Sequence, residues 1–343
     1  MVDSYSKRIS DIIYDTKNYE IEVQFYLTQH CNLGCRGCYM RSSPNAPRNV
    51  LPYDDLNFYL NQFDNVPNFT NMVTFSGGEI FTASINYVRT CANMVLDRGW
   101  GLQLKTNGAW VMDTQKCADV MNMLQNLQPG RGMVADEKQI HDFLRRYPKW
   151  LLRVCGRWLL MRKMPTTSML SMAVSVDDKL HPVQSADWFV KIADLIANDK
   201  KLRNRVNLKT FTVADSVPLL ESRVLNNPKL NIENFEKMPG KWAARYTING
   251  VRVESYVGDF VDVGNVPMEK KLTEIVVSPL GGSRGRVVYC FYPNGTVGFD
   301  CNYLESVGRV PFKTDTGTYK SFAQIQHDIH EKLVSDYARV IQK

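Results

Sequence analysis

Short runs rich in β-branched and aromatic residues alternate with longer amphipathic runs along most of this chain. Runs of the first kind predict strands, and apolar residues at three- and four-residue spacing predict helices. The predicted strands cover 22–28, 72–76, 101–106, 170–176, 206–213 and 273–278. The predicted helices between them cover 54–62, 83–96, 114–127 and 186–198. Strands alternating with helices predict an α/β fold built on a parallel sheet.

Six such strands favour a partial (β/α)6 TIM-like barrel, which two other segments interrupt or extend. Residues 128–168 are too long for an ordinary connection and are predicted to form a helical hairpin inserted in the barrel. After residue 280 the pattern changes to a predicted β-hairpin over 286–299 and a helix over 319–342. We therefore predict an N-terminal segment (1–21), a barrel domain (22–280) and a C-terminal extension (281–343).

The chain has 343 residues, 44% of them apolar and 22% charged, as expected for a globular protein with its own core. It contains no uninterrupted apolar run of about 18 residues and no apolar segment near its start, so we expect neither a membrane span nor a secretory signal. These features predict a cytoplasmic protein, in which thiols stay reduced. Clustered cysteines are then expected to bind metal or take part in catalysis.

The formal net charge of +7 is concentrated in the predicted insertion, which has nine Lys or Arg residues and three acidic ones. A basic helical hairpin can bind nucleic acid, phosphate or an acidic peptide, or it can be a solvated face around an apolar stripe. No RNA-recognition or helix-turn-helix signature accompanies it. Nucleic acid is therefore not the partner we expect.

Three cysteines, Cys31, Cys35 and Cys38, follow the first predicted strand with the spacing C-x3-C-x2-C. Three thiolates on one tight loop can hold three irons of a [4Fe-4S] cluster and leave the fourth iron without a protein ligand. The alternatives are a zinc site that lacks one ligand, or cysteines packed in a core.

Polar residues also follow the next three predicted strands. The second strand ends in Ser76-Gly77-Gly78-Glu79, the third is followed by Thr106-Asn107, and the fourth by Ser175-Val176-Asp177. Because the carboxyl ends of parallel strands meet on one face, we expect these groups to converge near the cysteine loop. Taken singly, each group also fits an ordinary turn or helix cap.

This order of motifs resembles the radical S-adenosylmethionine (SAM) superfamily over about residues 22–213. The resemblance implies that Cys31, Cys35 and Cys38 ligate a [4Fe-4S] cluster whose open iron binds SAM. It also implies a set of SAM-binding residues, in which the Gly-Gly-Glu residues hold the methionyl amino group, Ser175 and Asp177 hold the ribose, and Tyr39 lies near the adenine. The full set is Tyr39, Ser76, Gly77, Gly78, Glu79, Thr106, Asn107, Ser175 and Asp177.

The C-terminal extension resembles the start of the SPASM or twitch extension of peptide-modifying radical SAM enzymes, in the segment from Cys290 to Cys301. A two-residue turn at Asn294-Gly295 would place Cys290 opposite Phe299, so that Cys290 and Cys301 form a diagonal pair on one face. These two cysteines are interpreted as ligands of an auxiliary iron-sulfur cluster or, in a degenerate extension, as hydrogen donors to a substrate radical. Packing in a core is the structural alternative.

The resemblance implies an enzyme that cleaves SAM reductively and modifies a peptide or protein residue by crosslinking or epimerisation. A dehydrogenase or epimerase of a sugar, aminoglycoside or nucleoside is the alternative within the superfamily. A noncatalytic metal-binding module for nucleic acid is the alternative from another class. The expected partners are a reductase or flavodoxin-type electron donor and, because only about twenty residues precede the first strand, a separate peptide-recognition protein or the insertion itself.

Overall fold

The computed structural model describes residues 2–15, 18–35, 38, 40, 42–127, 170–178, 181–182, 184–213, 216–228, 230–238, 243–258, 278–279, 285–299 and 309–341. The predicted basic insertion at 128–168 lies outside these residues, as do Tyr39 and Cys301.

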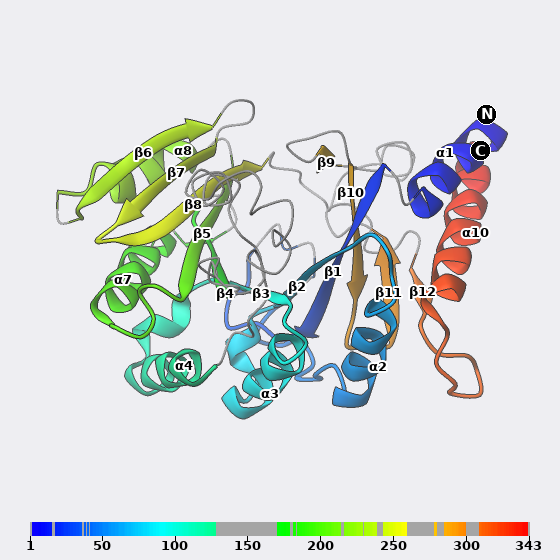
Figure 1. Cartoon of the computed structure of the whole chain (residues 1–343), viewed down its shortest axis with the longest axis horizontal. Helices are drawn as coiled ribbons and strands as arrows, with labels where there is room; N and C mark the ends of the chain where they lie inside the picture. Colours follow the sequence, from blue (N-terminus) through cyan, green and yellow to red (C-terminus); the bar gives the residue numbers. More distant parts are fainter. Residues whose placement is uncertain are drawn as a thin grey trace, which may run out of the picture.

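A single sheet runs through this part of the chain, in the order β12-β11-β10-β1-β2-β3-β4-β5-β8-β7-β6, with β9 paired to β10 (Figure 1). Its seven central strands, from β10 to β8, are mutually parallel, and the path has two separate ends. This confirms the predicted α/β fold with a parallel sheet arranged as an open barrel. The strands are β1 (Tyr19–Thr28), β2 (Phe69–Gly77), β3 (Gly101–Thr106), β4 (Leu170–Ser175), β5 (Val206–Val213), β6 (Ile232–Met238), β7 (Ala243–Ile248), β8 (Val251–Gly258), β9 (Ser278–Pro279), β10 (Gly285–Phe291), β11 (Thr296–Phe299) and β12 (Val310–Pro311).

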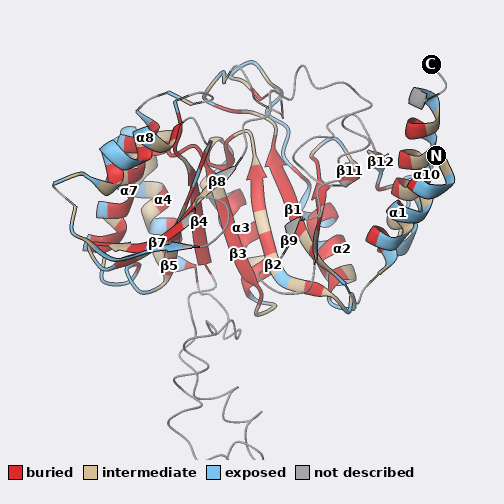
Figure 2. Ribbon diagram, turned by 90° about the horizontal axis from the view of Figure 1, so that it is seen from above, coloured by how far each residue is buried: buried red, intermediate tan, exposed pale blue. Residues whose placement is uncertain are grey.

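Four longer helices connect the parallel strands, close to the positions predicted. They are α2 (Tyr53–Phe63), α3 (Ile85–Leu96), α4 (Thr114–Asn126) and α7 (Ser185–Asn198). Each buries one side in the apolar core that it shares with alternate strand residues such as Val23 and Phe75. Figure 2 shows the buried residues gathered along the strands and on the sides of the helices that face them. The short helices are η1 (Ile80–Thr82), η2 (Ala109–Met112), α8 (Val217–Leu220) and η4 (Glu221–Leu225).

The sixth parallel strand differs from the prediction. Residues 273–277 lie outside the described residues, and Ser278 belongs to β9, which is antiparallel to β10. The place beside β5 is taken by β8, which also pairs antiparallel with β7. The alternating apolar residues Val251 and Val253 of β8 are fully buried. This pattern is typical of a strand with one face in the core.

The first residues form a helix that the sequence pattern did not reveal. Helix α1 (Val2–Tyr14) packs against the C-terminal helix α10 (Phe322–Ile341), and the two ends of the chain lie side by side in Figure 1. The rings of Tyr5 and Tyr337 stack with their centroids 4.0 Å apart. Charged and polar residues separate the buried apolar residues of α1 along the sequence. These apolar residues form a stripe on one side of the helix, although the sequence has no continuous apolar segment there. No helix in the described ranges has both the length and the apolarity to cross a bilayer.

The C-terminal hairpin forms as predicted, but its register is shifted by one residue. Cys290 lies opposite Gly298, and Phe299 lies opposite Tyr289. The Gly295 amide donates to the Tyr292 carbonyl at 3.1 Å, and Gly295 has a φ of +82°. The loop therefore has three residues, because Pro293 suits the first central position of a type I turn and Gly295 takes the left-handed position after it. The prediction that Cys290 faces Phe299 is wrong for this reason.

We expect Ile9→Ala to lower the free energy of unfolding by about 2–5 kcal/mol, because Ile9 is fully buried where α1 meets α10. Urea unfolding followed by circular dichroism measures this change. Lys7→Ala, on the exposed side of the same helix, should change it by less than about 0.5 kcal/mol. Equal effects of the two substitutions would contradict the packing of α1 on α10.

Candidate functional site

The cysteine loop leaves the end of β1 and returns close to it. The Cys31 amide donates to the Ser43 carbonyl at 3.2 Å, and the Cys38 amide donates to the Cys35 carbonyl at the same distance. The Cys31 side chain is 6% exposed, and its Sγ accepts from the Leu33 amide at 3.4 Å. The described part of the loop is therefore held at both ends by backbone hydrogen bonds.

Burial strongly affects the thiols of this loop. It raises the pKa of Cys31 to about 12 and that of Cys35 to about 11, with smaller contributions from the neighbouring thiols and, at Cys35, from Asp177. Both groups are consequently thiols at neutral pH in the protein alone. A bound cation would have to displace their protons and balance the charge of the resulting thiolates.

The chemistry of this donor set fits an iron-sulfur cluster. Cys31, Cys35 and Cys38 lie on one loop, where Cys35 and Cys38 add to the rise in the pKa of Cys31, and thiolates are the usual ligands of iron-sulfur clusters. Within the described ranges, however, no three His, Cys, Asp or Glu side chains are arranged as a metal-binding group. The fit therefore rests on the identity of the donors and on their shared loop.

Two glycines at the end of β2 allow it to approach the backbone that leads into the cysteine loop. A Cβ on Gly77 would lie 2.2 Å from the Thr28 carbonyl oxygen, and one on Gly78 would lie 2.3 Å from that of His30. The Gly78 amide donates to the Thr28 carbonyl at 2.9 Å, and the Glu79 amide to that of His30 at 3.0 Å. The glycines thus have a structural function here, and contact with SAM stays a prediction.

Glu79 is the central acceptor of the site. Its carboxylate, 2% exposed, accepts from the Thr106 hydroxyl at 2.9 Å, the Asn107 amide at 2.7 Å and the Phe81 amide at 3.1 Å. Burial raises the pKa of Glu79, and these hydrogen bonds oppose that effect. Glu79 therefore joins the end of β2 to the end of β3.

Asn107 connects this carboxylate to the cysteine loop. Its side-chain amide donates to Asn32 Oδ1 at 2.8 Å and lies 3.7 Å from Cys31 Sγ, while its own Oδ1 accepts from the Ala109 amide. Asn107 is 5% exposed. The predicted convergence of the ends of β2 and β3 near the cysteine loop is thus present in the structure.

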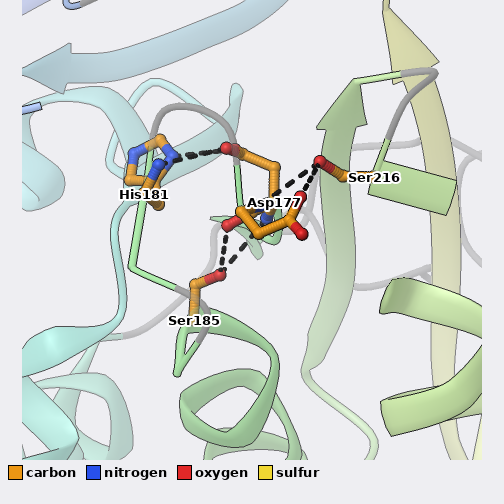
Figure 3. A network of polar contacts seen from close by, with 5 residues as sticks. Asp177, His181, Ser185 and Ser216 are labelled. Carbon is orange, nitrogen blue, oxygen red and sulfur yellow. Dashed lines mark hydrogen bonds and ion pairs between the residues drawn. The ribbon is translucent and has the colours of Figure 1, made fainter. Parts of the chain in front are cut away.

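A second polar group follows β4 (Figure 3). Asp177 is 3% exposed, and its carboxylate contacts His181 Nδ1 at 2.8 Å and accepts from the His181 amide at 3.1 Å. The Ser185 hydroxyl accepts from the Asp177 amide and donates to its carbonyl. Asp177 raises the pKa of Cys35, and His181 lowers that of Glu79, so this group belongs to the same site.

His181 was not singled out from the sequence. The available signal was its position four residues after Asp177, a spacing that lets both side chains meet on one turn. Such a spacing is common in any sequence, and only the fold shows that this pair lies near Cys35 and Glu79.

The remaining predicted residues fall in different places. Ser76 is buried at the end of β2, and Ser175 is partly buried at the end of β4. Cys290 is fully buried in a small apolar cluster with Tyr26, Met40 and Tyr292, against which Cys38 packs. The hairpin cysteine thus lies beside the cysteine loop, although the two are far apart in sequence.

Comparisons with known proteins find similarity to solved structures at low sequence identity. No protein-family model and no curated protein matches the sequence. Among solved structures, SuiB of Streptococcus suis bound to the precursor peptide SuiA is 12% identical with a TM-score of 0.45, covering 96% of this chain and 70% of that one. Native anSMEcpe with bound AdoMet is 12% identical with a TM-score of 0.43, covering 91% and 82%. Methylornithine synthase (PylB) is 13% identical with a TM-score of 0.35, covering 66% and 56%. This likeness is too remote to transfer a function.

We expect Gly78→Ala to lower the free energy of unfolding by about 1–3 kcal/mol, because the new Cβ would overlap backbone atoms of Gln29 and His30. Gly34→Ala is the matched control. Apart from its chain neighbours, no atom of the described residues lies within 4 Å of a Cβ placed on Gly34 in the cysteine loop. The Gly34→Ala protein should therefore be about as stable as the wild type. Thermal and urea unfolding measure both, and a Gly78→Ala protein as stable as the wild type would contradict this packing.

In metal-free protein, the rates at which iodoacetamide alkylates Cys31 and Cys35 should keep increasing at pH values where the rate of an ordinary thiol has levelled off. The reactive species is the thiolate, and burial holds the pKa values of these thiols at about 12 and about 11. Brief labelling followed by peptide mass spectrometry measures each rate, with glutathione as the reference. Rates that level off with glutathione near pH 9 would contradict the burial of these thiols.

Proposed function

We propose that this chain is a radical SAM enzyme. The observation that carries the proposal is the position of the cysteine loop, which lies against the ends of the neighbouring strands. There Asn107 contacts Cys31, and Asp177 and His181 act electrostatically on Cys35 and Glu79. A three-cysteine loop at the carboxyl edge of a parallel sheet, surrounded by buried polar side chains, suits a cluster with one open iron better than a structural zinc site.

In this proposal, Cys31, Cys35 and Cys38 would hold a [4Fe-4S] cluster and leave one iron open for SAM. The bound cluster would supply the electron for reductive cleavage of SAM, and the resulting 5'-deoxyadenosyl radical would abstract a hydrogen atom from the substrate. The barrel must exclude water and hold the substrate at the right distance.

The polar residues of the site have separate proposed functions. Glu79, with Gly77 and Gly78, orients the methionyl amino group. The network from Phe81, Thr106 and Asn107 already fixes its carboxylate and removes the need to reorganise it when the ligand binds.

Ser175 and Asp177 are proposed to hold the ribose, and Tyr39 the adenine. His181 fixes the orientation of the Asp177 carboxylate and lowers the pKa of Glu79. Ser76, at the end of β2, is proposed to belong to the same SAM site.

We propose a peptide or protein side chain as the substrate. The support is the C-terminal hairpin, which resembles the start of a twitch extension and places Cys290 in contact with the residues around Cys38. Cys290, with Cys301, is proposed to ligate an auxiliary cluster or to donate a hydrogen atom to the substrate radical. A flavodoxin-type reductase and a separate peptide-recognition protein complete the proposed system.

The proposal predicts that anaerobically reconstituted protein contains about four irons per chain, or about eight with an auxiliary cluster, and forms 5'-deoxyadenosine from SAM under reducing conditions. Cys35→Ala should abolish this product, because the cluster loses one of its three ligands. Iron analysis and chromatography of the product measure both.

Cys117→Ala is the matched control, since Cys117 lies on α4 and is partly buried outside the site. It should keep the iron content and activity of the wild type. Candidate peptides and sugars added to the same assay would identify the substrate class. Zinc bound in place of iron, or 5'-deoxyadenosine formation that survives Cys35→Ala, would refute the proposal.

A further inference from the structure

The central sheet has two faces, and one of them packs against the helices that connect the parallel strands. Val251 and Val253 of β8 are fully buried in this core, where α7 contacts β8. Successive residues of a strand point to opposite faces, so Glu254 lies on the other face. Lys105 lies there for the same reason, since its neighbour Leu104 is fully buried in the core. We call this second face the inner face of the sheet.

One row of residues crosses the inner face from β3 to β7. Because residues that are paired in the register of a sheet point to the same side, the members of this row are side-by-side neighbours on one face. In order across the strands they are Lys105, Ala173, Lys209, Glu254 and Arg245.

The part of this row on β5, β8 and β7 is balanced in charge. Glu254 Oε1 lies 3.3 Å from Arg245 Nε and 3.2 Å from Arg252 Nη2. Lys209 stands beside Glu254 in the register and acts on it electrostatically. Arg245 also lies opposite Glu236 of β6. Each cation in this part of the row therefore has an acidic neighbour.

Lys105, at the other end of the row, has partners of a different kind. Its ammonium group donates to Gln24 Oε1 at 3.0 Å and lies 5.5 Å from the centroid of the Phe211 ring. The apolar residue Ala173 separates it from Lys209. Both partners are uncharged, so they hold the ammonium group in place without neutralising it.

This end of the inner face has surface that a ligand can reach. Lys105 is partly exposed, and the Phe211 side chain is 37% exposed. The Phe211 ring stacks on that of Tyr256, with centroids 5.9 Å apart and an interplanar angle of 25°, which fixes its position. A fixed cation beside an accessible aromatic ring suits a carboxylate on a short apolar stem.

Lys105 also lies next to the candidate site. The two residues that follow it, Thr106 and Asn107, donate to the Glu79 carboxylate. Its partner Gln24 lies opposite Cys290 in the register of β1 and β10. A group bound at Lys105 would therefore lie between the proposed SAM site and the hairpin cysteine.

We infer that Lys105 binds a carboxylate of the substrate, and that the substrate is a peptide with Asp or Glu close to the residue that is modified. This inference rests on the proposed function, which places a peptide on the inner face. An ammonium group has three donors, so Lys105 can pair with a carboxylate and keep its contact with Gln24.

The test is an equilibrium selection on the anaerobically reconstituted full chain, without SAM or reductant. The probe is a random library of capped peptides of about eight residues, which span the inner face from β1 to β8 when extended. Mass spectrometry of bound and free peptides should show Asp and Glu enriched about threefold over Asn and Gln, as expected for a partly exposed ion pair.

Lys105→Met should lose this enrichment, and Lys105→Arg should keep it, because the preference depends on the positive charge. Lys105→Gln is a second neutral variant, which can still donate to Gln24 and should also lose it. Lys116→Met is the matched control, since Lys116 is a partly exposed lysine on α4, outside the site. No acidic enrichment in the wild type, or equal enrichment in both neutral variants, would overturn the inference.

Calorimetry with SAM distinguishes a substrate carboxylate from the methionyl carboxylate. If Lys105→Met weakens the binding of SAM about tenfold while the peptide preference stays the same, Lys105 belongs to the SAM site and the inference is overturned. Formation of 5'-deoxyadenosine without peptide tests the proposed function separately. A protein that forms this product but has no acidic preference would refute the substrate class alone.

Discussion

The buried carboxylate of Glu79 is the interaction on which the rest of the site depends. It accepts hydrogen bonds from Thr106 and from the Asn107 amide, and Asn107 in turn donates to the cysteine loop. Because Gly77 and Gly78 let β2 lie directly against the backbone before Cys31, this one carboxylate fixes the ends of three neighbouring strands. Losing it would leave several buried donors unsatisfied.

The same arrangement concentrates acidic groups. Glu79, Asp177 and the thiols of Cys31 and Cys35 gather at one edge of the sheet, where burial raises the pKa values of Glu79 and both cysteines. His181 opposes this effect at Glu79. A bound cation would favour the ionised forms of these groups, which is the electrostatic reason for proposing a metal cluster and a sulfonium ligand there.

The continuity of the sheet brings the C-terminal hairpin into this site. Because β10 pairs in parallel with β1, Cys290 lies opposite Gln24 and the Tyr292 ring stacks on that of Tyr26. The hairpin is thus part of the central sheet, and residues about 260 positions apart line one small cluster next to the cysteine loop. Arg309 extends this cluster, because its guanidinium carbon lies 3.6 Å from the centroid of the Tyr292 ring.

The parallel strands β1 to β5 and the helices between them could be predicted from the amino-acid sequence, because they depend on local periodicity. The convergence of polar residues after these strands could also be predicted, because the carboxyl ends of parallel strands lie on one side. The sequence could not determine β8 as the sixth parallel strand, the helix α1 or the three-residue loop at Gly295. Contacts between residues that are distant in the chain decide which strands pair, where an amphipathic helix is buried and which register a hairpin takes. For the same reason, the contact of His181 with Asp177 near Glu79 and the position of Arg309 over the Tyr292 ring could be seen only in the folded chain.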